Sequence, residues 1–148
     1  FTVWFGYTIH LKIGDKQAIV NNTRQNLITS PLIQNGRTLV PFRFIGEAVQ
    51  IPVHFLTDPE TKKVTHVYYS SSDMKLVLVI GSMLATVNGI TVKLDVPPQI
   101  IQGSTMIPLR FVSENLGFHL EWNSVDQTIH LQYPGKFAGR GQQTNRCM

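Results

Sequence analysis

Short blocks in which apolar and polar residues alternate recur along this chain. In the block 118–122 the apolar residues Phe118, Leu120 and Trp122 alternate with polar ones, and Ile129, Leu131 and Tyr133 do the same in the block 129–133. A period of two places successive side chains on opposite faces of a strand, so that one face is buried and the other is wet. The pattern predicts strands at 7–13 and 74–80 and a closing hairpin from 118 to 133, with Trp122 and Tyr133 on its buried face.

Two tight turns are expected where asparagine stands between short apolar blocks. Asn88-Gly89 separates the blocks 84–87 and 90–94, and Asn21-Asn22 occupies the corresponding place earlier in the chain. Two-residue hairpin turns need a positive φ at both central positions, which asparagine and glycine tolerate best. Both segments are therefore predicted to be β-hairpins.

Each of two short helices is predicted to begin with a proline in its first turn, where a missing N–H is not needed. These prolines are Pro41 and Pro108. Apolar residues then recur at helical spacing, namely Phe44, Ile45, Ala48 and Val49 in the first helix and Phe111, Val112 and Leu116 in the second. Gly117 is expected to end the second helix in the left-handed conformation.

These elements occur twice because the chain contains an internal duplication. A displacement of 67 residues superposes the segment 11–55 on 78–122 without a gap, and roughly a third of the aligned residues are identical. The fold class expected is α+β, with two tandem repeats at about 7–69 and 74–133, each a twisted antiparallel β-sheet packed on one short α-helix. A repeat of this size is marginal for an independent core. A single domain, 1–133, is therefore predicted, followed by a linker or an added tail at 134–148.

Charge and composition exclude some classes of function. The net charge is +4, but residues 1–133 hold 10 Lys+Arg against 9 Asp+Glu, and the remaining +3 comes from the tail. No basic face interleaved with aromatic residues is present, which argues against a nucleic-acid partner. No apolar run is long enough to span a membrane. The lone cysteine, Cys147, cannot form an internal disulfide.

The most similar segments of the two repeats resemble a known family. They are Val-Pro-Phe-Arg-Phe-Ile-Gly-Glu-Ala at 40–48 and Ile-Pro-Leu-Arg-Phe-Val-Ser-Glu-Asn-Leu-Gly at 107–117, with Leu-Glu-Trp-Asn downstream. The chain resembles, over about 8–133, the copper amine oxidase N-terminal-like domains, also called stalk domains. The resemblance implies a five-stranded antiparallel sheet around a helix, export by a Gram-positive bacterium, and a stalk or accessory role. No tyrosine follows an asparagine and no His-x-His occurs, so the quinone and copper chemistry of the oxidases is not carried over.

An arginine and a glutamate recur four residues apart in both predicted helices. The pairs are Arg43 with Glu47 and Arg110 with Glu114. An arginine fork can grip a ligand carboxylate or a sugar, or it can tie a helix to its sheet. Because both repeats keep the pair, the structural interpretation is favoured, with each arginine partly buried and hydrogen-bonded to a carboxylate or to backbone carbonyls of the domain.

Other candidate residues carry weaker signals. Exposed rings able to stack on sugars are expected at Trp4, Tyr68 and Tyr69. His119 and His130 are expected on one polar hairpin face, with His54 and His66 as counterparts, and no carboxylate completes either pair at a recognisable spacing. No metal, cofactor or catalytic residue is assigned, because no nucleophile, paired-acid or phosphate-loop motif is present.

The leading functional hypothesis is a non-enzymatic structural, stalk or adhesive module of a secreted or cell-surface bacterial protein. The alternatives are a module that binds carbohydrate or a cell-wall polymer, and an accessory domain of a surface enzyme. The expected location is extracellular, at the cell surface or cell wall. The expected partners are a cell-wall polysaccharide or another surface protein.

Overall fold

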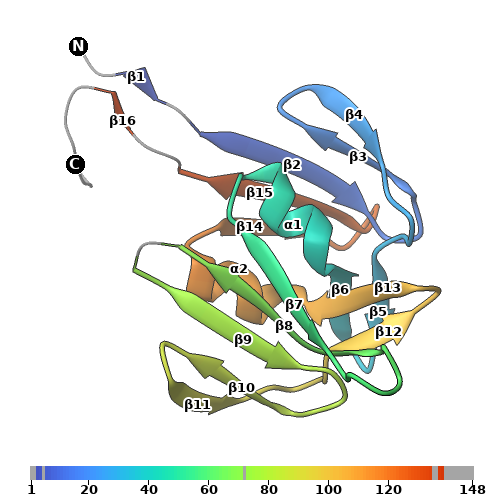
Figure 1. The fold of residues 1–148 in the computed structure, drawn as a ribbon. Coiled ribbons are helices and arrows are strands. Elements are labelled where there is room, and N and C mark those ends of the chain that lie inside the picture. Colours follow the sequence, from blue (N-terminus) through green and yellow to red (C-terminus); the bar gives the residue numbers. More distant parts are fainter. Residues whose placement is uncertain (1–2, 5, 72, 135–136, 139–148) are drawn as a thin grey trace.

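The structure is a computed structural model that describes residues 3–4, 6–71, 73–134 and 137–138. It is mostly antiparallel sheet with two short helices, an α+β architecture (Figure 1). The elements are β1 (Val3–Trp4), β2 (Tyr7–Lys12), β3 (Gln17–Val20), β4 (Thr23–Asn26), β5 (Leu32–Gln34), β6 (Arg37–Pro41), α1 (Phe42–Ala48), β7 (Val53–Thr57), β8 (Val64–Ser70), β9 (Lys75–Val79), β10 (Leu84–Val87), β11 (Ile90–Lys93), β12 (Gln99–Ile101), β13 (Ser104–Pro108), α2 (Leu109–Leu116), β14 (His119–Asn123), β15 (Thr128–Tyr133) and β16 (Phe137–Ala138).

Each of the two five-stranded sheets is assembled from both halves of the chain. One sheet has the order β14-β15-β2-β3-β4 and the other β11-β10-β9-β8-β7, as Figure 1 shows. The closing hairpin of each half therefore completes the sheet begun by the other half. The expectation that each repeat forms a sheet of its own is wrong. β8 is followed at once by β9, so these neighbouring strands pair with each other across the boundary between the halves.

A four-stranded sheet, β12-β13-β6-β5, joins the two halves of the chain. Its middle strands pair Val40 with Ile107, flanked by Pro41 opposite Met106 and Leu39 opposite Pro108. Val40 and Ile107 are themselves 67 residues apart. The pairing is therefore symmetric about its central pair and relates the two halves by a local two-fold.

The tight hairpins lie where asparagine was expected to allow them. Asn88 and Gly89 have φ of 51° and 83°, and Asn21 and Asn22 have φ of 49° and 69°. Each first asparagine also accepts a hydrogen bond through its Oδ1 from the preceding strand, from Thr8 N at 2.8 Å and from Lys75 N at 2.7 Å. The side chain thus ties the hairpin to its sheet, in addition to tolerating the turn.

Both helices follow a proline directly, but the proline occupies the capping position before the helix rather than its first turn. Gly117, with φ of 90°, ends α2 in the left-handed conformation as expected. The buried residues of α1 are Phe42, Ile45, Gly46 and Ala48, and those of α2 are Leu109, Val112 and Ser113. One apolar core, drawn from both halves, surrounds these faces.

Tyr69 is fully buried in this core, and its hydroxyl donates to the carbonyl of Phe42 at 2.7 Å. Tyr133 in β15 is half-buried and packs on Phe118 with ring centroids 4.9 Å apart. Trp122 is 40% exposed, so the expectation that it belongs to the core is wrong. It lies on β14, an edge strand, where the sheet covers it on one side only.

The chain enters and leaves the fold side by side. Tyr7 at the start of β2 pairs with Tyr133 at the end of β15, and β1 pairs with β16 beyond them. The segment 134–148, expected to be a linker, thus contributes β16, while Cys147 lies outside the described residues. Within the described part of the chain, no helix has the length and apolar character that crossing a membrane requires.

Candidate functional site

Two grooves occupy equivalent places in the two halves of the molecule. The first, here named the α1 groove, is lined by the start of α1, by Phe55 of β7 and by the segment 25–28. The second, the α2 groove, is lined by the start of α2, by Trp122 of β14 and by the segment 93–96. Their volumes are about 440 and 380 Å³, within the range of small-ligand sites.

Each groove also needs a turn supplied by the opposite half. Residues 103–105, at the turn between β12 and β13, line the α1 groove, whereas the corresponding turn between β5 and β6 lines the α2 groove. The pairing of β6 with β13 brings these turns across the local two-fold. Neither groove can therefore form without the central sheet.

In the α1 groove the charged and aromatic groups contact one another. The Nε of Arg43 lies 4.0 Å from the Oε2 of Glu47, and the guanidinium carbon lies 5.8 Å from the centroid of the Phe55 ring. Ile28, at the same groove, is 79% exposed. The α1 groove is thus an apolar surface on which the arginine is already engaged.

The α2 groove holds more charge. Arg37 donates from its Nε to the Oδ2 of Asp95 at 3.1 Å, an ion pair that joins the two halves of the chain. Arg110, Glu114 and Lys93 also line the groove. Among the described residues, neither Arg110 nor Lys93 has a carboxylate within 4.0 Å.

The structure corrects the expectation that the recurring arginines are partly buried. Arg43, Glu47, Arg110 and Glu114 are all exposed, and no ion pair between Arg110 and Glu114 is found in the part of the chain that the structure describes. An exposed ion pair contributes only about 0–1 kcal/mol to stability. The pair in α1 and the contact of Arg43 with Phe55 are exposed, so neither has the partly buried character that was expected.

Three aromatic rings were expected to be exposed, and the two whose side chains the structure describes are buried or half-buried. Tyr69 is wrong as a candidate because its side chain is fully buried. Tyr68 is half-buried and stacks on His54, with centroids 4.8 Å apart, while the Nζ of Lys75 lies 4.9 Å from its ring centroid. Trp4 lies in β1, but its side chain is outside the described residues. None of the three lines either groove.

The groove rings, Phe55 and Trp122, were missed as binding residues although a signal was present. They are equivalent under the 67-residue displacement, and both halves place an aromatic residue there. Alternation assigned Trp122 to the buried face, and alternation does not reveal that its strand lies at a sheet edge. The edge position leaves both rings open to solvent.

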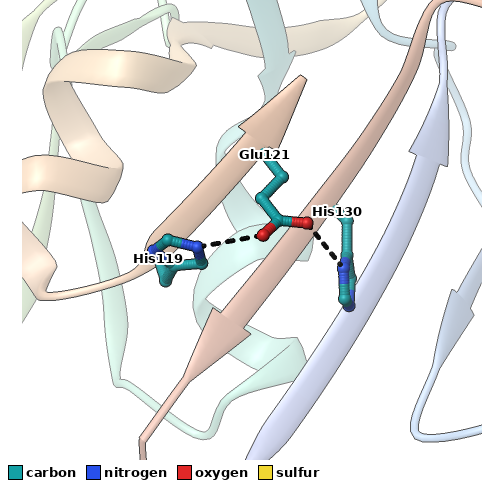
Figure 2. Close-up of polar contacts among 3 residues, drawn as sticks. All are labelled: His119, Glu121 and His130. Carbon is teal, nitrogen blue, oxygen red and sulfur yellow. Dashed lines mark hydrogen bonds and ion pairs between the residues drawn. The ribbon is translucent and has the colours of Figure 1, made fainter. Parts of the chain in front are cut away.

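A polar cluster lies on the outer face of the β14-β15-β2 sheet, as Figure 2 shows. Glu121 contacts His119 Nε2 at 3.2 Å through one oxygen and His130 Nδ1 at 3.7 Å through the other. A carboxylate thus lies between these histidines, contrary to the sequence-based expectation. It was missed because His119 and His130 are not directly opposite, whereas Glu121 is the cross-strand partner of His130.

His10 extends this cluster onto β2. Its ring stacks on that of His130, with centroids 4.3 Å apart and planes inclined by 6°. Partial burial, and secondarily the neighbouring His130, lower the pKa of His10 from its usual value of 6.5. In the described part of the chain, no group of three or more His, Cys, Asp or Glu side chains has the arrangement needed to hold a metal ion.

Comparison with protein families places these features in context. The family model of the copper amine oxidase N-terminal domain matches twice, at residues 5–65 and 53–131. The chain belongs to this family. The two matches to the copper amine oxidase N-terminal domain together cover both grooves and both helices. No curated protein and no solved structure matches the chain.

The copper amine oxidase N-terminal domain is a non-catalytic domain. The grooves of this chain hold groups that can bind a ligand. They combine an aromatic ring, an arginine and a glutamate on exposed surfaces, and such groups bind and orient a ligand.

Proposed function

We propose that this chain is a non-catalytic binding module of a bacterial surface protein and that it holds a cell-wall polysaccharide. The observation that carries the proposal is the exposed set of arginine, glutamate and aromatic ring at equivalent places in the two halves. Flat rings suit the apolar faces of pyranose sugars, and arginine donates several hydrogen bonds in a fixed fork. Two such grooves on one domain suit a repetitive polymer, because binding at both strengthens attachment.

The exposure of the arginines supports binding over scaffolding. A structural role predicts buried ion pairs, which both helices lack among the described residues. The arginines are instead exposed and line grooves that also hold open aromatic rings. An exposed arginine contributes little to stability, yet both halves have one at the same place. Ligand binding is the explanation that accounts best for this.

A spacing or stalk role is the second candidate, and the path of the chain disfavours it. Tyr7 and Tyr133 are cross-strand partners, so the chain enters and leaves the fold at the same end. A module with adjacent ends adds almost no length between the segments that it connects. The fold lies to one side of its two adjacent ends, as Figure 1 shows, and this arrangement suits the presentation of a binding surface.

Sedimentation with insoluble polymers tests the proposal. The purified protein is mixed with bacterial cell wall, cellulose or chitin, and the bound fraction is measured. We expect binding to at least one polymer, with a clear loss in the double variant Phe55→Ala/Trp122→Ala. The control is Ile90→Ala, an exposed apolar side chain that lies at neither groove. Absence of binding to all three, or equal binding by the double variant, would contradict the proposal.

Location at the cell surface is part of the same proposal. The family resemblance supports it, and proteolysis of intact source cells tests it. An exported module is digested while a cytosolic marker survives. Protection of both proteins until lysis would place the module inside the cell and remove the cell wall as its partner.

A further inference from the structure

The α1 and α2 grooves differ in charge at three equivalent positions. Asn26, Ile28 and Ser104 line the α1 groove, whereas Lys93, Asp95 and Arg37 occupy the corresponding places in the α2 groove. The α2 groove thus holds three cations against two carboxylates, and the α1 groove holds one of each. A shared fold presents two different surfaces.

Two cations of the α2 groove, unlike the arginine of the α1 groove, have no ion-pair partner among the described residues. In the α1 groove the guanidinium of Arg43 lies over Phe55 and contacts Glu47. In the α2 groove, by contrast, no cation lies over Trp122 among the described residues, and Arg110 has no carboxylate partner there. Asp95 is engaged by Arg37, which leaves Arg110 and Lys93 as the cations without an ion pair.

We infer that the α2 groove binds a sugar that carries a carboxylate, such as a uronic acid unit of an acidic polysaccharide. The inference rests on the proposed function and gives one of its two sites a ligand class. The Trp122 ring stacks on the face of the sugar, and the Arg110 fork donates parallel hydrogen bonds to the carboxylate oxygens. Lys93 adds positive charge on the same side. The α1 groove, in which Glu47 and Phe55 engage Arg43, does not select for the acid.

According to the inference, the groove recognises both the sugar ring and the carboxylate of the ligand. The probes therefore separate these two features. Oligogalacturonate presents sugar rings with carboxylates. Its methyl ester keeps the rings and removes the charge, and poly-glutamate keeps the charge and removes the rings. Because basic residues at 136, 140 and 146 attract any polyanion, all titrations are compared at one physiological ionic strength.

Calorimetric titration of the full chain gives the affinities. We expect oligogalacturonate to bind more tightly than either of the other probes. Trp122→Ala and Arg110→Gln should each weaken its binding roughly tenfold or more, as expected for loss of a charge-assisted contact. Arg110→Lys should recover only part of that loss, because lysine keeps the charge without the fork.

The other half of the chain supplies matched controls. Phe55→Ala and Arg43→Gln alter the equivalent residues of the α1 groove and should leave the affinity for oligogalacturonate within about twofold of the parent. Thermal melting of every variant separates loss of binding from loss of fold. Arg110 is exposed on a helix, so Arg110→Gln remains informative even if Trp122→Ala unfolds the edge strand.

Each adverse outcome has its own meaning. If the methyl ester binds as tightly as oligogalacturonate, the carboxylate is not recognised. If poly-glutamate binds as tightly, the sugar ring is not recognised. If variants of the two grooves lose equal affinity, the assignment of the ligand to the α2 groove is wrong. Binding of chitin or cellulose without binding of oligogalacturonate overturns this inference while the proposed function stands. Failure of every saccharide to bind contradicts both.

Discussion

At the scale of single residues, equivalent positions in the two helices differ according to what each one faces. Gly46 in α1 corresponds to Ser113 in α2. A Cβ on Gly46 would collide with Val53 and would lie 2.8 Å from Cε1 of Tyr69. Tyr69 fills this space to reach the carbonyl of Phe42, whereas Tyr133 in β15, the closing strand of the other half, packs on Phe118 instead. The glycine is therefore needed to make room for a buried tyrosine.

Gly46→Ala should accordingly destabilise the protein by about 1–3 kcal/mol, the usual range for overpacking a core. Ser113→Ala is the matched control, because that position already accommodates a Cβ. Its cost is confined to the hydrogen bond that the hydroxyl donates to the carbonyl of Arg110 at 3.1 Å. Denaturant unfolding measures both. A Gly46→Ala protein as stable as Ser113→Ala would refute the steric explanation.

The stacked pair of His10 and His130 gives the fold a dependence on pH. Because the pKa of His10 is lowered in the folded state, the unfolded chain binds its proton more readily. The contribution of His10 to stability is complete above its usual value of 6.5 and is lost as the pH falls through that value toward the folded pKa. Protonation thus favours unfolding at this site.

NMR titration of the imidazole resonances measures this effect directly. His10 should titrate below 6.5 in the parent and move back toward that value in His130→Gln, which removes the neighbouring charge. The shift should be partial, because burial is the larger cause. A His10 that titrates at the same pH in both proteins would show that the stacked neighbour contributes nothing.

At the scale of elements, each hairpin depends on one asparagine. Asn88 adopts φ of 51° and accepts from Lys75 N at 2.7 Å. Asn88→Ala loses the side-chain acceptor and forces alanine into a left-handed conformation, which should cost about 1–3 kcal/mol. Asn88→Asp should recover much of this, because aspartate keeps an acceptor and tolerates the same φ. Thermal melting of the two variants measures this difference. Equal melting temperatures would contradict the role given to the Asn88 side chain.

Local elements of this kind could be predicted from the sequence because their causes are local. The turns at Asn21-Asn22 and Asn88-Gly89 and the end of α2 at Gly117 each depend on a backbone conformation available to few residues. The environment of a side chain could not be predicted in the same way. The alternation of apolar and polar residues assigned Trp122 to the apolar face of its strand. How exposed the side chain is depends on which strand forms the edge of the sheet, and alternation does not show this.

At the scale of the whole molecule, the duplication predicted the elements but not how they combine. Two equivalent halves can each close their own sheet or exchange closing hairpins, and the same alternating patterns satisfy both arrangements. The structure has the exchanged arrangement, in which β8 pairs with β9 and β15 pairs with β2. The position of the grooves follows from this exchange and from the β6-β13 pairing, neither of which any single repeat contains.

The exchange has a consequence for unfolding. Each five-stranded sheet holds strands of both halves, and one core cluster includes residues of both, among them Val40 and Ile107 at the local two-fold. Neither half retains a complete sheet when the other unfolds. We therefore expect a single cooperative transition in which the amides of β2–β4 and β9–β11 lose protection together.

Ile107→Ala tests this cooperativity at the strand pairing that joins the two halves. Ile107 is fully buried, so its truncation should cost about 2–5 kcal/mol. Because its strand pairs with β6, hydrogen exchange should accelerate by a similar factor in both five-stranded sheets, while the exposed Ile90→Ala leaves exchange in both nearly unchanged. Acceleration confined to one sheet, or two separate transitions on heating, would mean that the halves fold independently despite sharing their strands.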